Sequence, residues 1–289
     1  MDKRPIAVFD SGLGGLTAVS VLRELMPEEN ILYFGDTARC PYGKKSRDKI
    51  RSMTRDIIDY LTGFDPKALF AACGTISVNA GDVITSFGLP SVNVFDPAIE
   101  EISRVSGEHP LAVIATEASI RTGSFQNGIR GACPDREVIA IPCQNFVTLC
   151  ETGHIAPDDG LLQTAVADYL APVKAAQADA MILGCTHFGI IAEAITDYLG
   201  AHTKLISASG SAAFAMQRLL VERGLTAGGG SDASGNDISS PPVAAGADTM
   251  KGSARFFTSG DPEEFEALAG RILGLHIKAE HVDMPPAEQ

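Results

Sequence analysis

The chain has 289 residues, of which 45% are hydrophobic and 20% charged, and this is enough apolar material for a substantial core. Aspartate and glutamate outnumber lysine and arginine by 36 to 23, and the formal charge of −13 argues against nucleic-acid binding. The sequence contains no apolar run near the roughly 18 residues of a membrane span and no signal-peptide pattern at its start. We therefore expect a soluble, cytoplasmic protein with no nucleic-acid or membrane partner.

Short apolar or β-branched runs alternate along the chain with longer helical patterns, which is typical of a parallel α/β fold. Ser46 is the predicted N-cap of a helix whose apolar residues recur every three or four positions up to Phe64. Asp261, followed by a proline and two glutamates, is the predicted N-cap of a helix near the C-terminus. We predict strands at Ile6–Phe9, Ile31–Phe34, Ala68–Ala72, Ser91–Phe95, Leu111–Ala115, Val138–Ile141 and Ala180–Gly184.

An internal similarity suggests two related halves. Leu69–Thr75 and Met181–His187 both look like an apolar strand that ends in a cysteine and is followed by a hydroxyl residue. Two similar domains that face each other would bring both strand ends into one cleft, with room for a small amino acid between the sulfurs of Cys73 and Cys185. We assign residues 1–97 and 209–289 to the first domain and 98–208 to the second. The segment 224–252, rich in Gly, Ser, Ala and Pro, is predicted to be a flexible surface loop.

The predicted strand ends carry a short list of reactive side chains. Ligands of open parallel sheets bind beyond the carboxyl ends of the strands, so these side chains should meet. Each has an ordinary structural alternative: a buried cysteine can be inert, an aspartate can cap the next helix, and a histidine can serve packing alone. The repetition of the cysteine motif in both halves favours a functional site. The strand ends in question are Asp10-Ser11, Cys73-Gly74-Thr75, Thr116 and Cys185-Thr186-His187.

Cofactor and metal motifs are missing from the sequence. A G-x-G-x-x-G pattern from Gly12 would need glycine where Thr17 stands, and there is no Walker A motif. No two of the six cysteines form a C-x-x-C pair, and no histidine stands at zinc-ligand spacing from them. We therefore predict neither a metal nor a cofactor. The other four cysteines should be dispensable for any chemistry, namely Cys40, Cys133, Cys143 and Cys150.

Six segments together resemble the motifs of bacterial glutamate racemases, in the aspartate/glutamate racemase superfamily. They are Ile6–Thr17, Tyr33–Arg39 with Pro41–Gly43 and Ser46, Ala72–Thr75, Phe146–Gly153, Leu183–His187, and Thr258–Pro262 with Phe265. The resemblance implies two parallel-sheet α/β domains related by pseudo-twofold symmetry, with an interdomain active site. It also implies a cofactor-independent, homodimeric enzyme that supplies D-glutamate for peptidoglycan.

The resemblance further implies roles for particular residues. Cys73 would act on D-glutamate and Cys185 on L-glutamate, each as acid or base on one face of the substrate. Asp10 would assist Cys73, and His187 would assist Cys185 with Glu151 nearby. A free thiol has a pKa of about 8.5, so a modest shift would yield a usable thiolate. The implied substrate-binding residues are Asp10, Ser11, Pro41, Tyr42, Gly43, Cys73, Gly74, Thr75, Thr116, Cys185, Thr186 and His187.

The chain departs from the family pattern at Gly74, where the family usually has asparagine. This departure predicts weaker binding of glutamate and a lower KM for a Gly74→Asn variant. Other functions are open at this point. A racemase for aspartate, a hydantoin or another amino acid would keep both cysteines, and a cysteine hydrolase would use one cysteine with a histidine base. A non-catalytic binding descendant would tolerate Gly74 and also Phe188-Gly189, where the family usually has Tyr-Pro.

Overall fold

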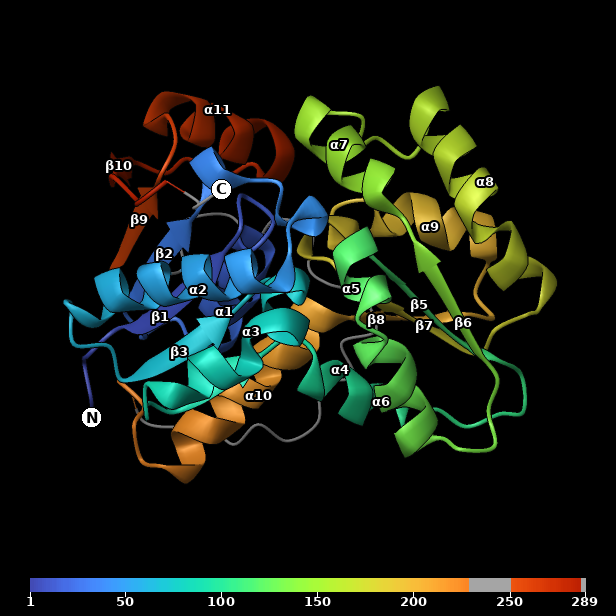
Figure 1. The fold of residues 1–289 in the computed structure, drawn as a ribbon, viewed down its shortest axis with the longest axis horizontal. Helices are drawn as coiled ribbons and strands as arrows, with labels where there is room; N and C mark the ends of the chain where they lie inside the picture. Colours follow the sequence, from blue (N-terminus) through green and yellow to red (C-terminus); the bar gives the residue numbers. More distant parts are fainter. Residues whose placement is uncertain (229–250, 287–289) are drawn as a thin grey trace.

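The computed structural model describes residues 1–228 and 251–286, which form two α/β domains that lie side by side (Figure 1). Most of the predicted loop at 224–252 falls outside these described residues. Among the described residues, no helix is long and apolar enough to cross a lipid bilayer.

The first domain contains a six-stranded, all-parallel sheet that draws strands from both ends of the chain. Its strand order is β10 (Ala279–His281), β9 (Ala254–Thr258), β2 (Ile31–Gly35), β1 (Ile6–Asp10), β3 (Ala68–Ala71) and β4 (Ser91–Asn93). Its helices are α1 (Leu16–Leu25), α2 (Arg47–Thr62), α3 (Gly74–Ser86), α10 (Ala208–Glu222) and α11 (Pro262–Leu273).

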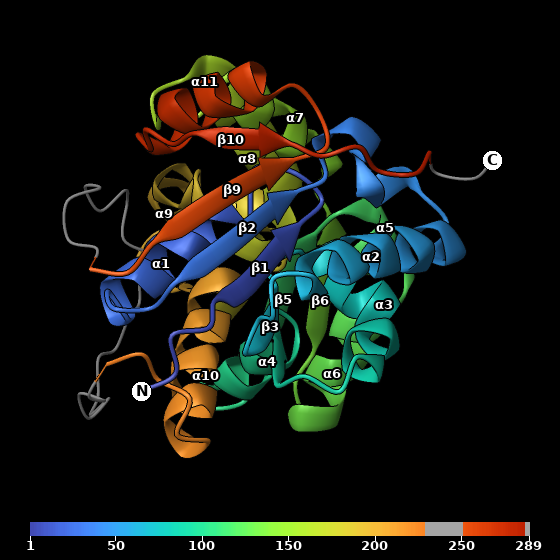
Figure 2. The ribbon, with the colours of Figure 1, turned by 90° about the vertical axis from the view of Figure 1, so that its left-hand side faces the viewer.

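Helices cover both faces of this sheet (Figure 2), so its central strands β1, β2 and β3 are buried throughout. Successive side chains of a strand point to opposite faces. Ile6 and Val8 therefore belong to the core beneath α1 and α10, whereas Ala7 and Phe9 belong to the core beneath α2 and α3.

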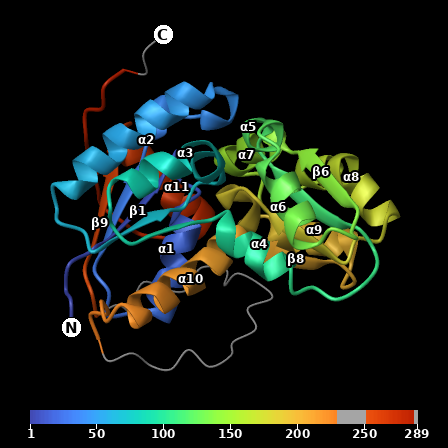
Figure 3. The ribbon, with the colours of Figure 1, turned by 60° about the horizontal axis from the view of Figure 1, so that its bottom comes forward.

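The second domain contains a four-stranded parallel sheet, in the order β6 (Val138–Pro142), β5 (Leu111–Ala115), β7 (Ala180–Leu183) and β8 (Lys204–Ser207). Its helices are α4 (Asp96–Ile102), α5 (Glu117–Arg121), α6 (Ser124–Ala132), α7 (Gln144–Thr152), α8 (Gly160–Ala175) and α9 (Ala192–Leu199). Helix α4 packs against α10 of the first domain where the two domains join (Figure 3). One core cluster therefore runs continuously through both domains.

The two sheets share one strand order. Strands β4-β3-β1-β2 of the first domain correspond to β8-β7-β5-β6 of the second. Cys73 follows β3 and Cys185 follows β7, so the two cysteines stand at equivalent strand ends. The prediction of two parallel-sheet α/β domains is confirmed.

Most of the helix caps and strands predicted from local sequence are present in the structure. Ser46 caps α2 through its hydroxyl, which accepts a hydrogen bond from the Lys49 amide at 3.4 Å, and Asp261 caps α11 by accepting from the Glu263 amide at 2.8 Å. The seven predicted strands are present, although β4 ends two residues earlier than expected. The sequence analysis did not predict three strands: β8 and β10, which are short and partly polar, and β9, which follows the predicted loop.

A buried ion pair ties the start of β3 to the segment before β2. Lys67 and Glu29 are 1% and 2% exposed and bond directly to each other. The Lys67 ammonium also donates to the Asp2 carbonyl at 2.7 Å, and Glu29 accepts from the Ala227 amide at 2.8 Å. These contacts fasten the N-terminal segment and the chain after α10 to the first domain.

We predict that Glu29→Ala lowers the free energy of unfolding by about 3–5 kcal/mol, because it leaves the Lys67 ammonium buried without its partner. Denaturant titration measures this loss. The matched control is Arg104→Ala, which removes an exposed pair with Glu100 and should cost less than about 1 kcal/mol. Equal losses in the two variants would show that the buried pair contributes no more than a surface pair.

Candidate active site

A small cavity lies where the carboxyl ends of β1 and β3 meet those of β5 and β7. All twelve residues predicted to bind substrate line it, together with three that the sequence analysis did not select: Cys40, Gln144 and Val147. Glu151 is not among the lining residues. The cavity volume is about 20 Å3, which is room for little more than one water molecule. The structure is therefore closed, and the expected space for an amino acid between the two thiols is not present in this arrangement.

Asp10 and Ser11, at the end of β1, lie beside the Cys73 thiol. The thiol lies 3.4 Å from the Ser11 hydroxyl. One Asp10 oxygen accepts from the Ser11 amide at 2.6 Å, and the other accepts from the Gly15 amide and from the Thr186 hydroxyl at 3.2 Å. Asp10 therefore orders the glycine-rich turn after β1, as the helix-capping alternative proposed, and also reaches the second domain.

His187 and Glu151 form a line of polar groups behind Cys185. The Cys185 sulfur lies 3.8 Å from His187 Nδ1. His187 Nε2 lies 3.3 Å from a Glu151 oxygen, although the angle does not make a hydrogen bond. His187 is 4% exposed, whereas the Glu151 side chain is 37% exposed at the end of α7. Thiol, imidazole and carboxylate thus lead outward from the cavity toward solvent.

Burial keeps both thiols protonated in the closed cavity. It raises the pKa of Cys73 to about 12, with the Asp10 carboxylate adding to the effect. It also raises the pKa of Cys185 well above the usual range of a thiol. The expectation of a modest shift is therefore wrong for this arrangement, because desolvation opposes the thiolate. Burial thus favours the neutral form of both thiols in this closed arrangement.

Hydroxyl groups and helix N-termini supply the hydrogen-bond donors of the cavity. Thr75 and Thr116 are buried and lie 3.0 Å apart through their hydroxyl oxygens, across the domain boundary. Cys73 precedes the first turn of α3, and Cys185 precedes the 3-10 turn Thr186–Gly189. The first amides of such turns have no partner within the helix, so they can bind carboxylates.

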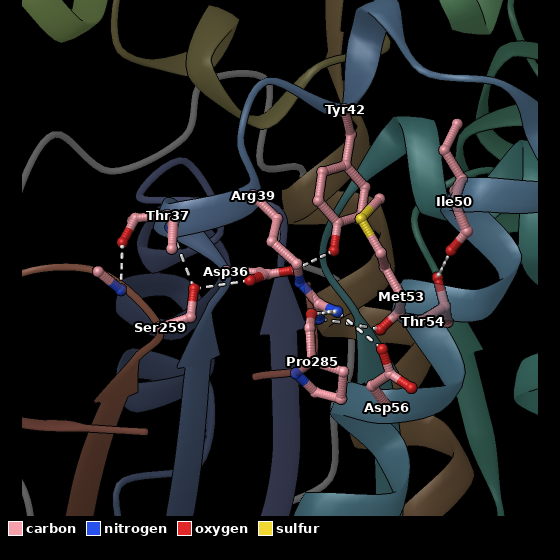
Figure 4. Close-up of polar contacts among 12 residues, drawn as sticks. Asp36, Thr37, Arg39, Tyr42, Ile50, Met53, Thr54, Asp56, Ser259 and Pro285 are labelled. Atoms are coloured by element: carbon pink, nitrogen blue, oxygen red, sulfur yellow. Dashed lines mark hydrogen bonds and ion pairs between the residues drawn. The ribbon is translucent and has the colours of Figure 1, made fainter. Parts of the chain in front are cut away.

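A buried polar network fixes the turn that carries Pro41, Tyr42 and Gly43 (Figure 4). The Tyr42 hydroxyl donates to Asp36, which also accepts from Arg39 Nε at 2.7 Å and from the Ser259 hydroxyl at 2.6 Å. This network anchors Arg39 and Tyr42, and with them the turn, to Asp36 of the first domain.

A cluster of three residues of metal-ligand types lies away from this cavity. Within the described residues, ligand atoms of His109, Asp179 and His202 come within 4.8 Å of one another. These residues precede β5, β7 and β8, at the strand ends opposite the cysteines. Asp179 already pairs with Arg136, and the group has no contact with the cavity.

Comparison with known proteins places the chain in a family. The sequence profile of the Asp/Glu/Hydantoin racemase family matches residues 17–214. The chain belongs to this family.

Similarity to individual members extends over nearly the whole chain. The glutamate racemase of Beutenbergia cavernae is 32% identical over 97% of this chain and 93% of its own. The structure is similar to that of the glutamate racemase isoform RacE1 from Bacillus anthracis, with a TM-score of 0.86, 28% identity and 99% coverage of both chains. It is also similar to the Francisella tularensis glutamate racemase in complex with D-glutamate, with a TM-score of 0.82, 31% identity and 98% coverage of both chains. The resemblance to glutamate racemases is confirmed.

The structure changes the interpretation of Gly74, where family members usually have asparagine. A Cβ atom at this position would overlap the Gly184 carbonyl oxygen and lie 3.1 Å from the carbonyl carbon. The predicted benefit of Gly74→Asn is therefore wrong for this closed arrangement, because any side chain would force the ends of β3 and β7 apart.

We predict that Gly74→Ala lowers the free energy of unfolding by about 1–3 kcal/mol through overpacking against backbone atoms. Gly81→Ala is the matched control within α3, since a Cβ there meets no atom within 4 Å. The control should be stabilising by up to about 1 kcal/mol. Thermal or denaturant unfolding measures both, and stabilisation by Gly74→Ala would contradict the close approach.

The raised thiol pKa values also predict a pH dependence of stability. A thiol that favours its neutral form in the folded state stabilises the fold below about pH 8.5, the unfolded pKa, and loses this contribution as pH rises toward the folded pKa. Burial raises the pKa of Cys150 to about 12, so this thiol should contribute to the loss. The free energy of unfolding should fall between about pH 8.5 and 10, and Cys150→Ala should reduce the slope by up to about 1.4 kcal/mol per pH unit. An unchanged slope would contradict the effect of burial.

Proposed function

We propose that this protein is a cofactor-independent glutamate racemase that interconverts L- and D-glutamate with two thiols. One observation carries the proposal: two cysteines at equivalent strand ends of two domains line one cavity, and each has its own titratable neighbour. A reaction that inverts a carbon centre needs an acid or base on each face of that centre. The similar proteins from Beutenbergia cavernae and Francisella tularensis are named glutamate racemases, which supports the same reaction.

In the proposed reaction, the Cys73 thiolate removes the α-proton of D-glutamate. The electron pair of the Cα–H bond stays on Cα as a planar carbanion, and the Cys185 thiol donates its proton to the opposite face. The product is L-glutamate, with Cys73 protonated and Cys185 ionised. The reverse reaction exchanges the roles of the two cysteines.

The high pKa of each buried thiol assigns a task to its neighbour. Asp10 accepts the proton of Cys73, and His187, 3.8 Å from the Cys185 sulfur, accepts the proton of Cys185. Glu151 stabilises the resulting imidazolium from 3.3 Å. These transfers produce the thiolates inside a cavity that would otherwise keep both thiols neutral.

The donors of the cavity suit a substrate with two carboxylates. The hydroxyls of Ser11, Thr75, Thr116 and Thr186 and the first amides of the turns after Cys73 and Cys185 are the proposed donors. Without a cofactor, such fixed donors around the α-carboxylate must stabilise the carbanion. They also counter the overall negative charge of the chain locally.

A basic groove beside the cavity supports an anionic substrate. The groove has a volume of about 480 Å3 and is lined by Lys44, Lys45, Arg47 and Arg121. Among the described residues, no carboxylate lies within ion-pair distance of these four cations. The groove lies next to the turn Pro41–Gly43, so separation of the two domains at this turn would connect it to the cavity. It provides a positively charged approach on an acidic protein.

The function also implies a setting for the protein. D-glutamate is a peptidoglycan building block, and we propose that the enzyme supplies it in the cytoplasm as a homodimer. Sedimentation equilibrium tests the dimer directly.

We predict that Cys73→Ala and Cys185→Ala each reduce racemisation by at least about 100-fold, because each variant lacks the proton carrier on one face. Proton NMR in deuterated water measures α-deuteration of L- and D-glutamate, and L- and D-aspartate are assayed alongside. Cys133→Ala, outside the cavity, is the control and should retain activity. Near-wild-type racemisation by either cysteine variant would contradict the two-thiol reaction.

The same assay of the wild-type protein tests the choice of substrate. Faster deuteration of aspartate than of glutamate would assign aspartate as the substrate, and no deuteration of either would favour a hydrolase or a binding protein.

A further inference from the structure

Gln144 contributes a buried acceptor without a partner to the cavity. It is the first residue of α7 and extends into the cavity from the second domain. Within the described part of the chain, the Gln144 Oε1 atom is buried and has no hydrogen-bond partner. A buried carbonyl oxygen without a partner is destabilising, so its presence in a binding cavity indicates a ligand that completes it.

The position of Gln144 is defined by the residues around it. A Cβ atom on Gly43 would lie 2.5 Å from Gln144 Oε1 and 3.2 Å from the Thr116 Cβ atom. Gly43 therefore leaves the space that the amide oxygen occupies. The amide lies between the turn of the first domain and the end of β5 in the second, among the proposed substrate-binding residues.

The cavity offers more hydrogen-bond donors for the carboxylates of an amino acid than acceptors for its ammonium group. Serine and threonine hydroxyls and the turn amides can donate to carboxylates, whereas the α-ammonium of an amino acid requires acceptors. Both Asp10 oxygens already accept bonds from the protein. Gln144 Oε1 is uncommitted, and among the described residues no lysine or arginine lines the cavity.

We propose that Gln144 Oε1 accepts a hydrogen bond from the α-ammonium of the bound substrate. This proposal rests on the proposed racemase function, because that function supplies the amino-acid substrate. The bond holds the Cα atom from the second domain while the turn Pro41–Gly43 closes from the first. Gln144 is then a substrate-binding residue that forms its contact when the domains are closed.

The test compares Gln144→Met with Gln144→Glu. Methionine has a similar length and removes the acceptor, whereas glutamate keeps an acceptor at the same position. Gln126→Met is the matched control, since Gln126 also has a buried, unpartnered Oε1 but lies in α6 away from the cavity. The measurements are kcat and KM for L- and D-glutamate and the inhibition constant of glutarate, which has both carboxylates but no ammonium.

We expect Gln144→Met to raise KM by about 10- to 100-fold with a smaller change in kcat, as for a lost hydrogen bond to a charged group. Its inhibition constant for glutarate should stay within about threefold of wild type, because glutarate never makes this bond. Gln144→Glu should bind glutamate more tightly than Gln144→Met does, and Gln126→Met should leave KM unchanged.

Two results would overturn the proposal. An unchanged KM in Gln144→Met would show that the amide does not contact the substrate. A glutarate inhibition constant that rises as much as KM would show that the amide binds a carboxylate through its N–H groups or only shapes the cavity. If the wild-type protein does not racemise glutamate, the proposed function fails separately, and calorimetric titration with glutamate and glutarate still compares the two ligands in wild type and Gln144→Met. Equal weakening of both ligands would then reject the contact.

Discussion

The close approach of Gly74 to the carbonyl of Gly184 is the constraint on which the site depends. These residues stand next to the two cysteines, at the ends of β3 and β7, and neither places a side chain between the strand ends. The thiols of two separate domains therefore share one cavity. The same approach explains why the volume of the closed cavity is only about 20 Å3.

The close approach of the two domains also determines the pKa values of the two thiols. Water is excluded from both thiols, and desolvation raises the pKa of each above its ordinary value. A site designed around free thiolates would have to be more open or more cationic. This one instead places a carboxylate beside one thiol and an imidazole beside the other, which are the proton acceptors of the proposed reaction.

The sequence predicted the cysteines, Asp10, Thr116 and His187 as neighbours because parallel strands deliver their carboxyl ends to one edge of each sheet. The two-domain fold followed from the repeated cysteine motif. Gln144 was missed because it lies two residues beyond β6 and belongs to none of the motifs, and only tertiary packing brings its amide to the cavity. The structural reason for Gly74 could not be predicted either. The sequence shows that the usual asparagine is missing, but the backbone carbonyl that would overlap its side chain belongs to Gly184, which is far away in the sequence. The shift of the thiol pKa values was underestimated for the same reason, because burial by the opposite domain is not encoded locally.

The hydrogen-bond network around Tyr42 affects which end of the chain can carry a tag. Arg39, which helps to fix the Pro41–Gly43 turn, bonds through Nη1 to Asp56 at 2.7 Å and to the Pro285 carbonyl at 3.2 Å (Figure 4). The end of the polypeptide is thus joined to the same scaffold as the turn at the cavity mouth, whereas Met1 lies near the opposite, amino-terminal edge of the first sheet (Figure 1). An affinity tag or fusion partner is better attached at the N-terminus, because Pro285, near the other end of the described chain, already contacts Arg39 of the network that orients Tyr42.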